Sequence, residues 1–305
     1  MRKLLALLFF TITLGMAQGA NAGPYEVGMD WYNRGDYATA LSMWRPLAAQ
    51  GHADAQNNLG RMYRKGQGVS SNSQEAVKWW RLAAAQGDAN AQISLGNMYK
   101  DGRGVVEDLK EAVKWYRLAA AQGVAEAQNT LGLMYEDGQG VVQDHKEAVK
   151  WWRLAAAQGV AEAQNNLGFM YESGTGVAQD LKEAEKWYRK AAAQGNAGAQ
   201  RNLGSLYREG RGVPKHYSEA MKWFRLASAQ GDAWAHMELG MMYENGFGVP
   251  QDYVRAHMWY NLAGAIEGGI RLPKPGLEAH MTPQQIAQAQ AMATRCHQSN
   301  YKNCD

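Results

Sequence analysis

A period of 36 residues runs through most of this chain and constrains its fold more than any other feature. Glycine recurs at that interval six times, and so does tryptophan. The positions are Gly60, Gly96, Gly132, Gly168, Gly204 and Gly240, and Trp79, Trp115, Trp151, Trp187, Trp223 and Trp259. Self-similarity at a fixed period of roughly 20–50 residues is the signature of a repeat architecture. The sequence therefore predicts six full units between about residues 52 and 268.

Each unit is predicted to contain two helices. In the third unit, Leu131 and Met134 recur at helical spacing, and Gly138 provides a residue that can end a helix in the left-handed conformation. Asp144 then begins a second helix with Glu147 three residues on, which is the spacing of a capping box. The same cap is expected at Asn72, Asp108 and Asp180. His216 interrupts this series, so Ser218 is the expected cap there.

The glycine inside each first helix needs a physical reason, since glycine costs roughly 1 kcal/mol relative to alanine in a helix. We expect it to let a neighbouring helix approach closely. The recurring tryptophans are expected to form the core between helices rather than a ligand-binding row. A single hairpin cannot bury its apolar face, but stacked hairpins can. The predicted fold is an all-α, right-handed α-solenoid of helix-turn-helix repeats.

The residues of the third unit, LGLMYEDGQGVVQDHKEAVKWWRLAAAQG, resemble the Sel1-like repeat, a relative of the tetratricopeptide repeat. The resemblance extends over about residues 52–268. It implies a helical-hairpin solenoid of the exported bacterial type that serves as a protein-binding scaffold. The G-x-G turns could suggest phosphate binding, but a phosphate-binding loop follows a strand, and these turns lie between helices.

The first 22 residues are predicted to be a secretory signal peptide. Arg2 and Lys3 precede an apolar run from Leu4 to Leu14, and the small residues around Ala22 form a cleavage site. A membrane anchor is the alternative, but the run is shorter than the roughly 20 residues that a spanning helix needs. The protein is therefore expected in the periplasm or secreted, without stable membrane insertion after signal removal.

The two ends of the mature chain differ from its middle. Residues 23–51 are predicted to form an N-terminal capping hairpin like a tetratricopeptide unit, followed by the six repeats in residues 52–269. Residues 270–305 are predicted to hold a C-terminal capping helix, started by Thr282, and a tail. In an oxidising compartment Cys296 and Cys304 are expected to form a disulfide, with two free thiols as the alternative.

Motifs for catalysis and for metal binding are not found in the sequence. The seven histidines show neither HExxH spacing nor a zinc pattern with cysteine. The stretch from Ser299 to Lys302 matches S-x-x-K, but the S-D-N and K-T-G partners of penicillin-recognising enzymes are missing. We therefore predict a non-catalytic protein without catalytic residues, metal or cofactor. A cell-envelope enzyme of the β-lactamase or penicillin-binding type and a glycan-binding module are the alternatives.

The resemblance implies a concave groove lined by the first helices, at positions two and five residues before and after the leucine of the repeated Leu-Gly. This groove is expected to bind a protein or peptide of the cell envelope. Export and the absence of a basic stripe argue against nucleic acid. Ordinary solvated residues are the alternative interpretation of these positions. The candidate groove residues are Arg61, Arg64, Lys100, Leu133, Glu136, Phe169, Glu172, Arg201, Arg208, Trp234, Met237 and Met241.

Overall fold

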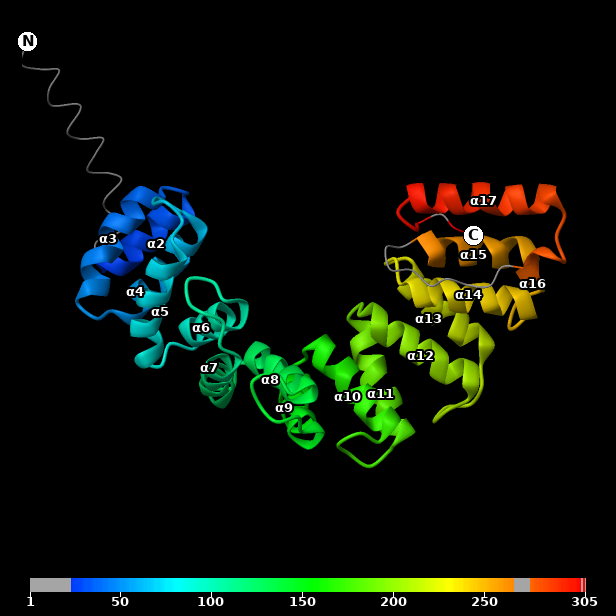
Figure 1. Cartoon of the computed structure of the whole chain (residues 1–305), viewed down its shortest axis with the longest axis horizontal. Coiled ribbons are helices and arrows are strands. Elements are labelled where there is room, and N and C mark those ends of the chain that lie inside the picture. The colour runs from blue at the N-terminus through cyan, green and yellow to red at the C-terminus, as the bar shows by residue number, and fades with distance from the viewer. Residues whose placement is uncertain (1–22, 266–274, 303, 305) are drawn as a thin grey trace, which may run out of the picture. The chain divides into compact units, whose positions relative to one another are not determined.

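The computed structural model of the chain describes residues 23–265, 275–302 and 304, so the predicted signal peptide lies outside the described residues. The described part contains sixteen helices and no strand (Figure 1). This is the all-α repeat fold that the sequence predicts. The helices are α2 (Pro24–Asn33), α3 (Tyr37–Ala49), α4 (Ala53–Lys65), α5 (Ser73–Ala85), α6 (Ala89–Asp101), α7 (Leu109–Ala121), α8 (Ala125–Asp137), α9 (His145–Ala157), α10 (Ala161–Ser173), α11 (Leu181–Ala193), α12 (Ala197–Glu209), α13 (Tyr217–Ser228), α14 (Ala233–Asn245), α15 (Tyr253–Ala265), α16 (Pro275–Glu278) and α17 (Pro283–Gln298).

The chain divides into two compact units between Gln143 and Asp144. The first unit contains α2 to α8, and the second contains α9 to α17. Within each unit, helices that follow one another in the chain pack against each other. The even-numbered helices α4 to α14 are the first helices of the repeats, and the odd-numbered helices α5 to α15 are the second helices.

In the repeats that lie within one unit, the glycine inside the first helix packs against an aromatic ring of the second helix. A Cβ atom added to Gly204 would lie 2.7 Å from the ring of Phe224, which is closer than such atoms approach. Gly96 and Gly168 face Tyr116 and Tyr188 in the same way. The expected close approach of a neighbouring helix is therefore confirmed. The part of that helix that contacts the glycine is an aromatic ring and not the backbone.

The ring at this contact belongs to the second residue of each aromatic pair. Trp80 is fully buried in this way, whereas the preceding Trp79 is half-buried and packs against the core of the preceding hairpin. Trp115 and Trp223 occupy equivalent half-buried positions against the cores beside them. The recurring tryptophan therefore joins neighbouring repeats, and the aromatic residue after it fills its own hairpin.

The ends of the helices follow the predicted chemistry with one correction. The side chain of Asp144 accepts hydrogen bonds from the backbone N–H groups of Lys146 and Glu147. The prediction that Ser218 caps α13 is wrong, because Nδ1 of His216 accepts from the backbone N–H of Glu219 (3.3 Å). A neutral imidazole nitrogen can replace a carboxylate oxygen as an acceptor.

The turn between the two helices of a repeat rests on the preceding repeat. Gly104 has a φ of 72° in the turn after α6, and a Cβ atom there would collide with the backbone of Ser73 at the start of α5. Gly212 has the same relation to Leu181 in the second unit. Glycine at this position thus serves both the left-handed conformation and the close approach of two repeats.

A chain of glutamine side chains links successive helices. The amide of Gln56 donates to the carbonyl oxygen of Ala48 at the end of α3 (2.9 Å). Its own side-chain oxygen accepts from Gln86 at the end of α5 (2.8 Å). The same two bonds recur in the second unit, where Gln200 donates to Ala192 and accepts from Gln230. Sequence reasoning missed these residues, although Gln56, Gln92, Gln128, Gln164 and Gln200 share the period of 36 residues.

The N-terminal hairpin of α2 and α3 repeats the internal packing in a shorter form. Gly28 faces the ring of Trp44, as Gly60 faces Trp80. The indole nitrogen of Trp44 donates to the carbonyl oxygen of Tyr25 (3.1 Å). The hairpin therefore continues the repeat core to the N-terminal end of the first unit.

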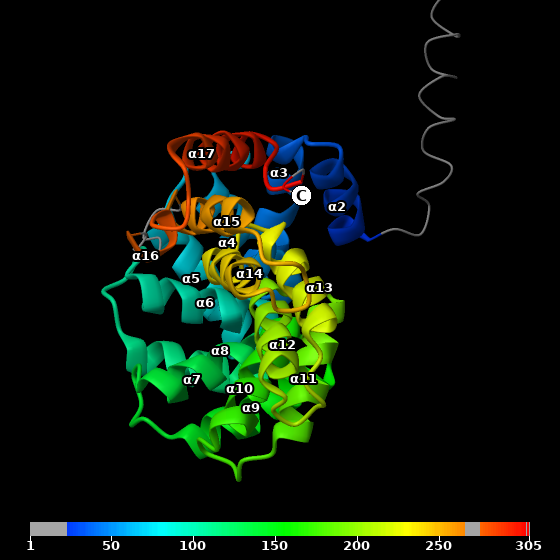
Figure 2. The ribbon, with the colours of Figure 1, turned by 90° about the vertical axis from the view of Figure 1, so that its right-hand side faces the viewer.

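The C-terminal segment covers the last repeat. Helix α17 lies along α15 (Figure 2) and buries Ala289, Ala293 and Cys296 against it. Thr282 and Gln285 form the predicted capping box at the start of α17. The expected disulfide joins Cys296 and Cys304.

His236 stands where the earlier repeats have the linking glutamine. It is fully buried, and its Nε2 lies 3.2 Å from the carbonyl oxygen of Ser228. Its ring stacks on Trp259 and also contacts Tyr301 of the tail. Burial lowers the pKa of His236 from 6.5 to about 4, which outweighs the opposite effects of Ser228 and Asp232.

Two substitutions in α12 should have opposite effects on stability. Gly204→Ala places a methyl group in the ring of Phe224 and should lower the free energy of unfolding of the second unit by about 1–3 kcal/mol. Gly198→Ala is the matched control, because a Cβ atom there meets only ordinary contacts of 3.4 Å or more. This control should raise the free energy of unfolding by up to about 1 kcal/mol. Urea unfolding measures both, and equal effects of the two variants would contradict the packing role of Gly204.

The buried histidine should make the stability of the second unit depend on pH. The unfolded chain takes up a proton on His236 near pH 6.5 and the folded chain only near pH 4, so its contribution is complete above pH 6.5 and is lost as the pH falls toward 4. Between about pH 7.5 and pH 5 the wild-type protein should lose roughly 2 kcal/mol more than His236→Gln. Urea unfolding at the two pH values measures this difference. Parallel losses in both proteins would rule out His236 as the cause.

Candidate functional site

The predicted groove positions lie on the first helices of both units. We call the surface formed by these positions the first-helix face. In the first unit it comprises Arg61 and Arg64 on α4, Lys100 on α6, and Leu133 and Glu136 on α8. In the second unit it comprises Phe169 and Glu172 on α10, Arg201 and Arg208 on α12, and Trp234, Met237 and Met241 on α14.

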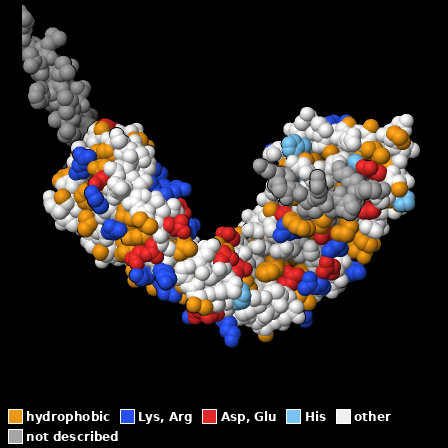
Figure 3. Space-filling view, viewed as in Figure 1, with side chains coloured by type: hydrophobic (Ala, Val, Ile, Leu, Met, Phe, Trp, Pro, Cys, Tyr) orange, Lys and Arg blue, Asp and Glu red, His pale blue; other side chains and the backbone are white. Residues whose placement is uncertain are grey.

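The first unit has a cavity of about 380 Å³ on this face, between α4 and α6. Two arginines predicted from the sequence, Arg61 and Arg64, line it together with Lys65. The remaining lining residues are Asn57, Trp80, Asn90, Ile93, Ser94, Asn97, Met98 and Glu126. Figure 3 shows basic side chains gathered at the right-hand edge of this unit, with acidic ones below them. The cavity is therefore polar and predominantly basic.

Several first-helix positions are more buried than a solvated groove position would be. Asn57 is only 8% exposed, because its side-chain oxygen accepts a hydrogen bond from the indole nitrogen of Trp80 (3.1 Å). Ile93 and Asn129 are also buried. The position two residues before the leucine of the repeated Leu-Gly is therefore buried in the three repeats of Asn57, Ile93 and Asn129. Lys100 and Leu133 are half-buried.

In the second unit, ion pairs join neighbouring first helices. Arg201 on α12 pairs with Asp232, the N-cap of α14 (3.0 Å). Arg208 lies 3.2 Å from a carboxylate oxygen of Glu238 on α14. Glu238 is 8% exposed, and its burial raises its pKa by more than the charge of Arg208 lowers it. The two predicted arginines thus have carboxylate partners within the protein.

Glu172 is held in place from two directions. One carboxylate oxygen accepts a hydrogen bond from the hydroxyl of Tyr188 (2.6 Å), and the other pairs with Arg211 (2.7 Å). Burial, followed by the charge of Glu172, raises the pKa of Tyr188 above its usual value of 10.0, so the hydroxyl remains a donor. The carboxylate therefore helps to fix α10 against its neighbours.

Sequence reasoning did not identify Asp232, Glu238 or Arg211 as partners. The period gives no consistent signal for them, because only Asp88 repeats the residue type of Asp232, only Arg103 repeats that of Arg211, and no other repeat has glutamate at the position of Glu238. Each pair depends on which side chains of adjacent repeats face each other, and the spacing of residues in the sequence does not determine this.

Two aromatic side chains of the first-helix face are exposed. Phe169 on α10 is 48% exposed and Trp234 on α14 is 52% exposed. Met237 is half-buried and packs against the core of α14 and α15, and the sulfur of Met241 lies 3.9 Å from Nη1 of Arg208. Figure 3 shows such hydrophobic side chains interspersed with charged ones on the second unit. Exposed aromatic residues beside fixed polar groups can bind a partner without prior rearrangement.

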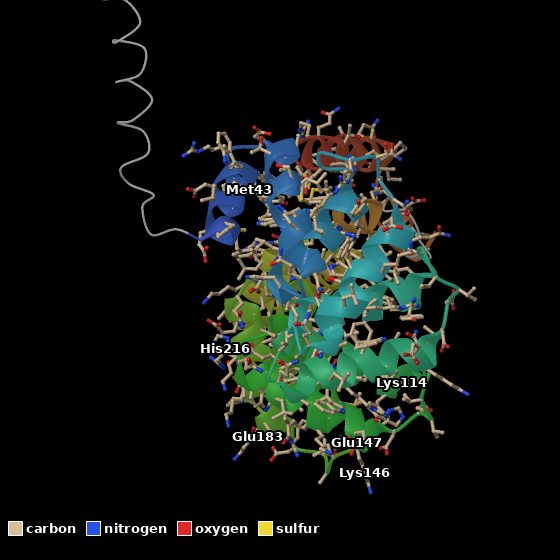
Figure 4. The ribbon with its side chains drawn as sticks, turned by 90° about the vertical axis from the view of Figure 1, so that its left-hand side faces the viewer. Met43, Lys114, Lys146, Glu147, Glu183 and His216 are labelled. Atoms are coloured by element: carbon tan, nitrogen blue, oxygen red, sulfur yellow. A yellow bond between two sulfur atoms is a disulfide. The ribbon has the colours of Figure 1, made fainter. Side chains whose placement is uncertain are left out.

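The second helices present a different surface. Their N-terminal residues Glu147, Glu183 and His216 point into solvent along one edge of the second unit (Figure 4). Glu147 and Glu183 pair with lysines one turn later, Lys150 and Lys186. Such exposed pairs contribute little specificity, since they are repetitive and solvated.

Residues 23–265, 275–302 and 304 contain no group of three His, Cys, Asp or Glu side chains placed to hold a metal ion. None of the helices in these ranges combines the length and apolar character needed to cross a bilayer. The hydroxyl of Ser299 in the S-x-x-K stretch donates to the carbonyl oxygen of Cys296 (2.8 Å).

Comparison with known proteins yields one family. The Sel1 repeat family model matches residues 53–88, 89–124, 125–160, 161–196, 197–232 and 235–265. No curated protein sequence matches the chain.

Two solved structures are similar over most of the chain. A Sel1 repeat protein from Oxalobacter formigenes is 33% identical over 80% of this chain and all of its own, with a TM-score of 0.75. The protein c5321, a protective antigen present in uropathogenic Escherichia coli strains, is 26% identical over 94% of this chain and 86% of its own, with a TM-score of 0.52.

The pair of Arg208 and Glu238 should behave as a coupled unit. Arg208→Met leaves a buried carboxylate without its ion-pair partner and should lower the free energy of unfolding of the second unit by about 2 kcal/mol. Adding Glu238→Gln to the same chain should recover most of this loss, because the uncompensated charge is removed. A double-mutant cycle by urea unfolding measures the coupling, and losses that simply add would contradict it.

Proposed function

The chain belongs to the Sel1 repeat family, and on this premise we propose that it is a non-catalytic scaffold that binds a protein or peptide on its first-helix face. The observation that carries this proposal is the exposure of Phe169 and Trp234 on α10 and α14 of the second unit. None of the other five repeats has an aromatic residue at either position: the equivalents of Phe169 are Arg61, Asn97, Leu133, Ser205 and Met241, and those of Trp234 are Asp54, Asn90, Glu126, Glu162 and Gly198. The repeat itself therefore does not require aromatic side chains there.

The energetics of binding favour this face. Aromatic side chains bury a large area at a low cost in conformational entropy, and they are enriched among residues that dominate interface energy. The ion pairs of Arg201 and Arg208 connect α12 to α14 before any partner arrives. A surface that is already ordered loses less entropy on binding, so more of the contact energy appears as affinity.

We further propose that the protein acts in the periplasm or outside the cell, on a partner of the cell envelope. The N-terminal sequence of residues 1–22 supports export, and the disulfide between Cys296 and Cys304 suits an oxidising compartment. The similar protein c5321 is described as a protective antigen, which also supports a location outside the cytoplasm.

Replacing both aromatic residues should weaken partner capture. Phe169→Ala combined with Trp234→Ala removes two exposed rings without touching the buried core, so capture should fall at least about tenfold while helicity stays unchanged. The measurement is crosslinking in the native cell envelope, followed by mass spectrometry and quantitation of the captured partner. Far-UV circular dichroism checks the fold.

The matched control carries Leu154→Ala and Leu226→Ala. These leucines are similarly exposed in the same unit, but they lie on the second helices α9 and α13. The control variant should capture the partner as the wild-type protein does. Unaltered capture by the aromatic variant, or an equal loss in both variants, would refute the assignment to the first-helix face.

A further inference from the structure

We propose that the cavity between α4 and α6 in the first unit binds a carboxylate of an acidic peptide segment. The proposal rests on the proposed function and adds the chemistry of the partner. Arg61, Arg64 and Lys65 provide the positive charge, and the amide groups of Asn57 and Asn97 provide hydrogen-bond donors.

The cations of the cavity have no carboxylate partner among the described residues. Arg64 and Lys65 form no ion pair within residues 23–265, 275–302 and 304, and Arg61 contacts only neutral groups there, namely Asn58 and the ring of Tyr32. The second unit differs, because Arg201 and Arg208 on its first-helix face are both paired with carboxylates. Among the arginines of the first-helix face, those without a carboxylate partner in the described residues are therefore the two at the cavity of the first unit.

Two asparagine side chains present their donor ends to the cavity. The indole N–H of Trp80 can only donate, so the side-chain oxygen of Asn57 must face it, at 3.1 Å. The hydroxyl of Tyr116 donates to the side-chain oxygen of Asn97 (2.6 Å). Both amide NH₂ groups are thus left for a ligand, and a buried core residue sets the direction of each. A group of fixed donors selects a ligand that accepts hydrogen bonds.

The other walls favour a peptide over a polyanion. Ile93 and Met98 supply apolar surface, which suits the methylene groups of a glutamate or aspartate and a neighbouring apolar side chain. Glu126 is exposed at the same cavity and would repel a ligand with many closely spaced negative charges. A single carboxylate attached to a peptide avoids this repulsion, whereas a polyphosphate or a nucleic acid does not.

The experiment compares two labelled peptides by fluorescence anisotropy on the full chain after signal removal. The first is Gly-Ser-Gln-Leu-Glu-Ser-Gly with an amidated C-terminus, and the second carries glutamine in place of its one glutamate. The wild-type protein should bind the glutamate peptide at least about tenfold more tightly than the glutamine peptide. Unlabelled glutamate peptide should displace the labelled one, whereas inorganic phosphate at the same concentration should not.

The variant Arg61→Gln with Arg64→Gln should reduce affinity for the glutamate peptide at least about tenfold and leave the glutamine peptide unchanged. The control variant Lys78→Gln with Lys114→Gln removes the same net charge from exposed positions on α5 and α7, where Figure 4 shows Lys114 pointing into solvent. This control should change affinity less than about twofold.

A third variant, Asn97→Asp, tests the amide donor. The second carboxylate oxygen of the new aspartate replaces the NH₂ group, so the donor is lost while the first oxygen still accepts from Tyr116. This variant should therefore lose about as much affinity for the glutamate peptide as the arginine variant does. Asn97 is exposed, and helicity should be unchanged. Equal binding of the two peptides, equal losses in the arginine and lysine variants, or displacement by phosphate would each overturn the proposal.

The results separate this proposal from the proposed function. If the aromatic variant still captures its partner but the arginine variant loses the glutamate peptide, only the assignment to the second unit fails. If the aromatic variant loses its partner and the peptides bind equally, only the acidic chemistry of the cavity is wrong.

Discussion

The contact between a helix glycine and an aromatic ring is the constraint on which the rest of the structure depends. Because Gly204 has no Cβ atom, the ring of Phe224 lies directly against the backbone of α12. This brings the two helices of a hairpin close together and fixes their register. The glutamine links then connect that hairpin to the one before it, through Gln200 and Ala192. The position of every groove residue follows from these two contacts.

The two units use one scaffold for different surface chemistry. In the second unit, the charges on the first-helix face are largely neutralised by bonds between repeats, and what remains for a partner is apolar area at Phe169 and Trp234. In the first unit, Arg61 and Arg64 keep their charge available beside ordered amide donors. Burial of apolar area supplies affinity, whereas unpaired charge supplies orientation and selectivity.

The repeat period predicted most of the fold from the sequence, since glycine and cap residues have local geometric causes. The caps at Asp144 and Thr282 and the helix end at Gly138 are examples. Burial depth was harder to predict, because helical spacing gives the direction of a side chain and not its distance from the core. Asn57, for example, occupies a predicted groove position but is buried. The ion pair of Arg208 could not be predicted, because it depends on how adjacent repeats face each other.

The turn glycines have a consequence for evolution. Gly104 lies against the backbone of Ser73, so the contact joins one repeat to the repeat before it. The glutamine links likewise connect only adjacent helices. Duplication or deletion of whole repeats therefore leaves each contact with an equivalent partner, whereas a gain or loss that is not a whole number of repeats breaks them. The array can change in length by recombination between repeats, while its two capping ends remain the fixed boundaries.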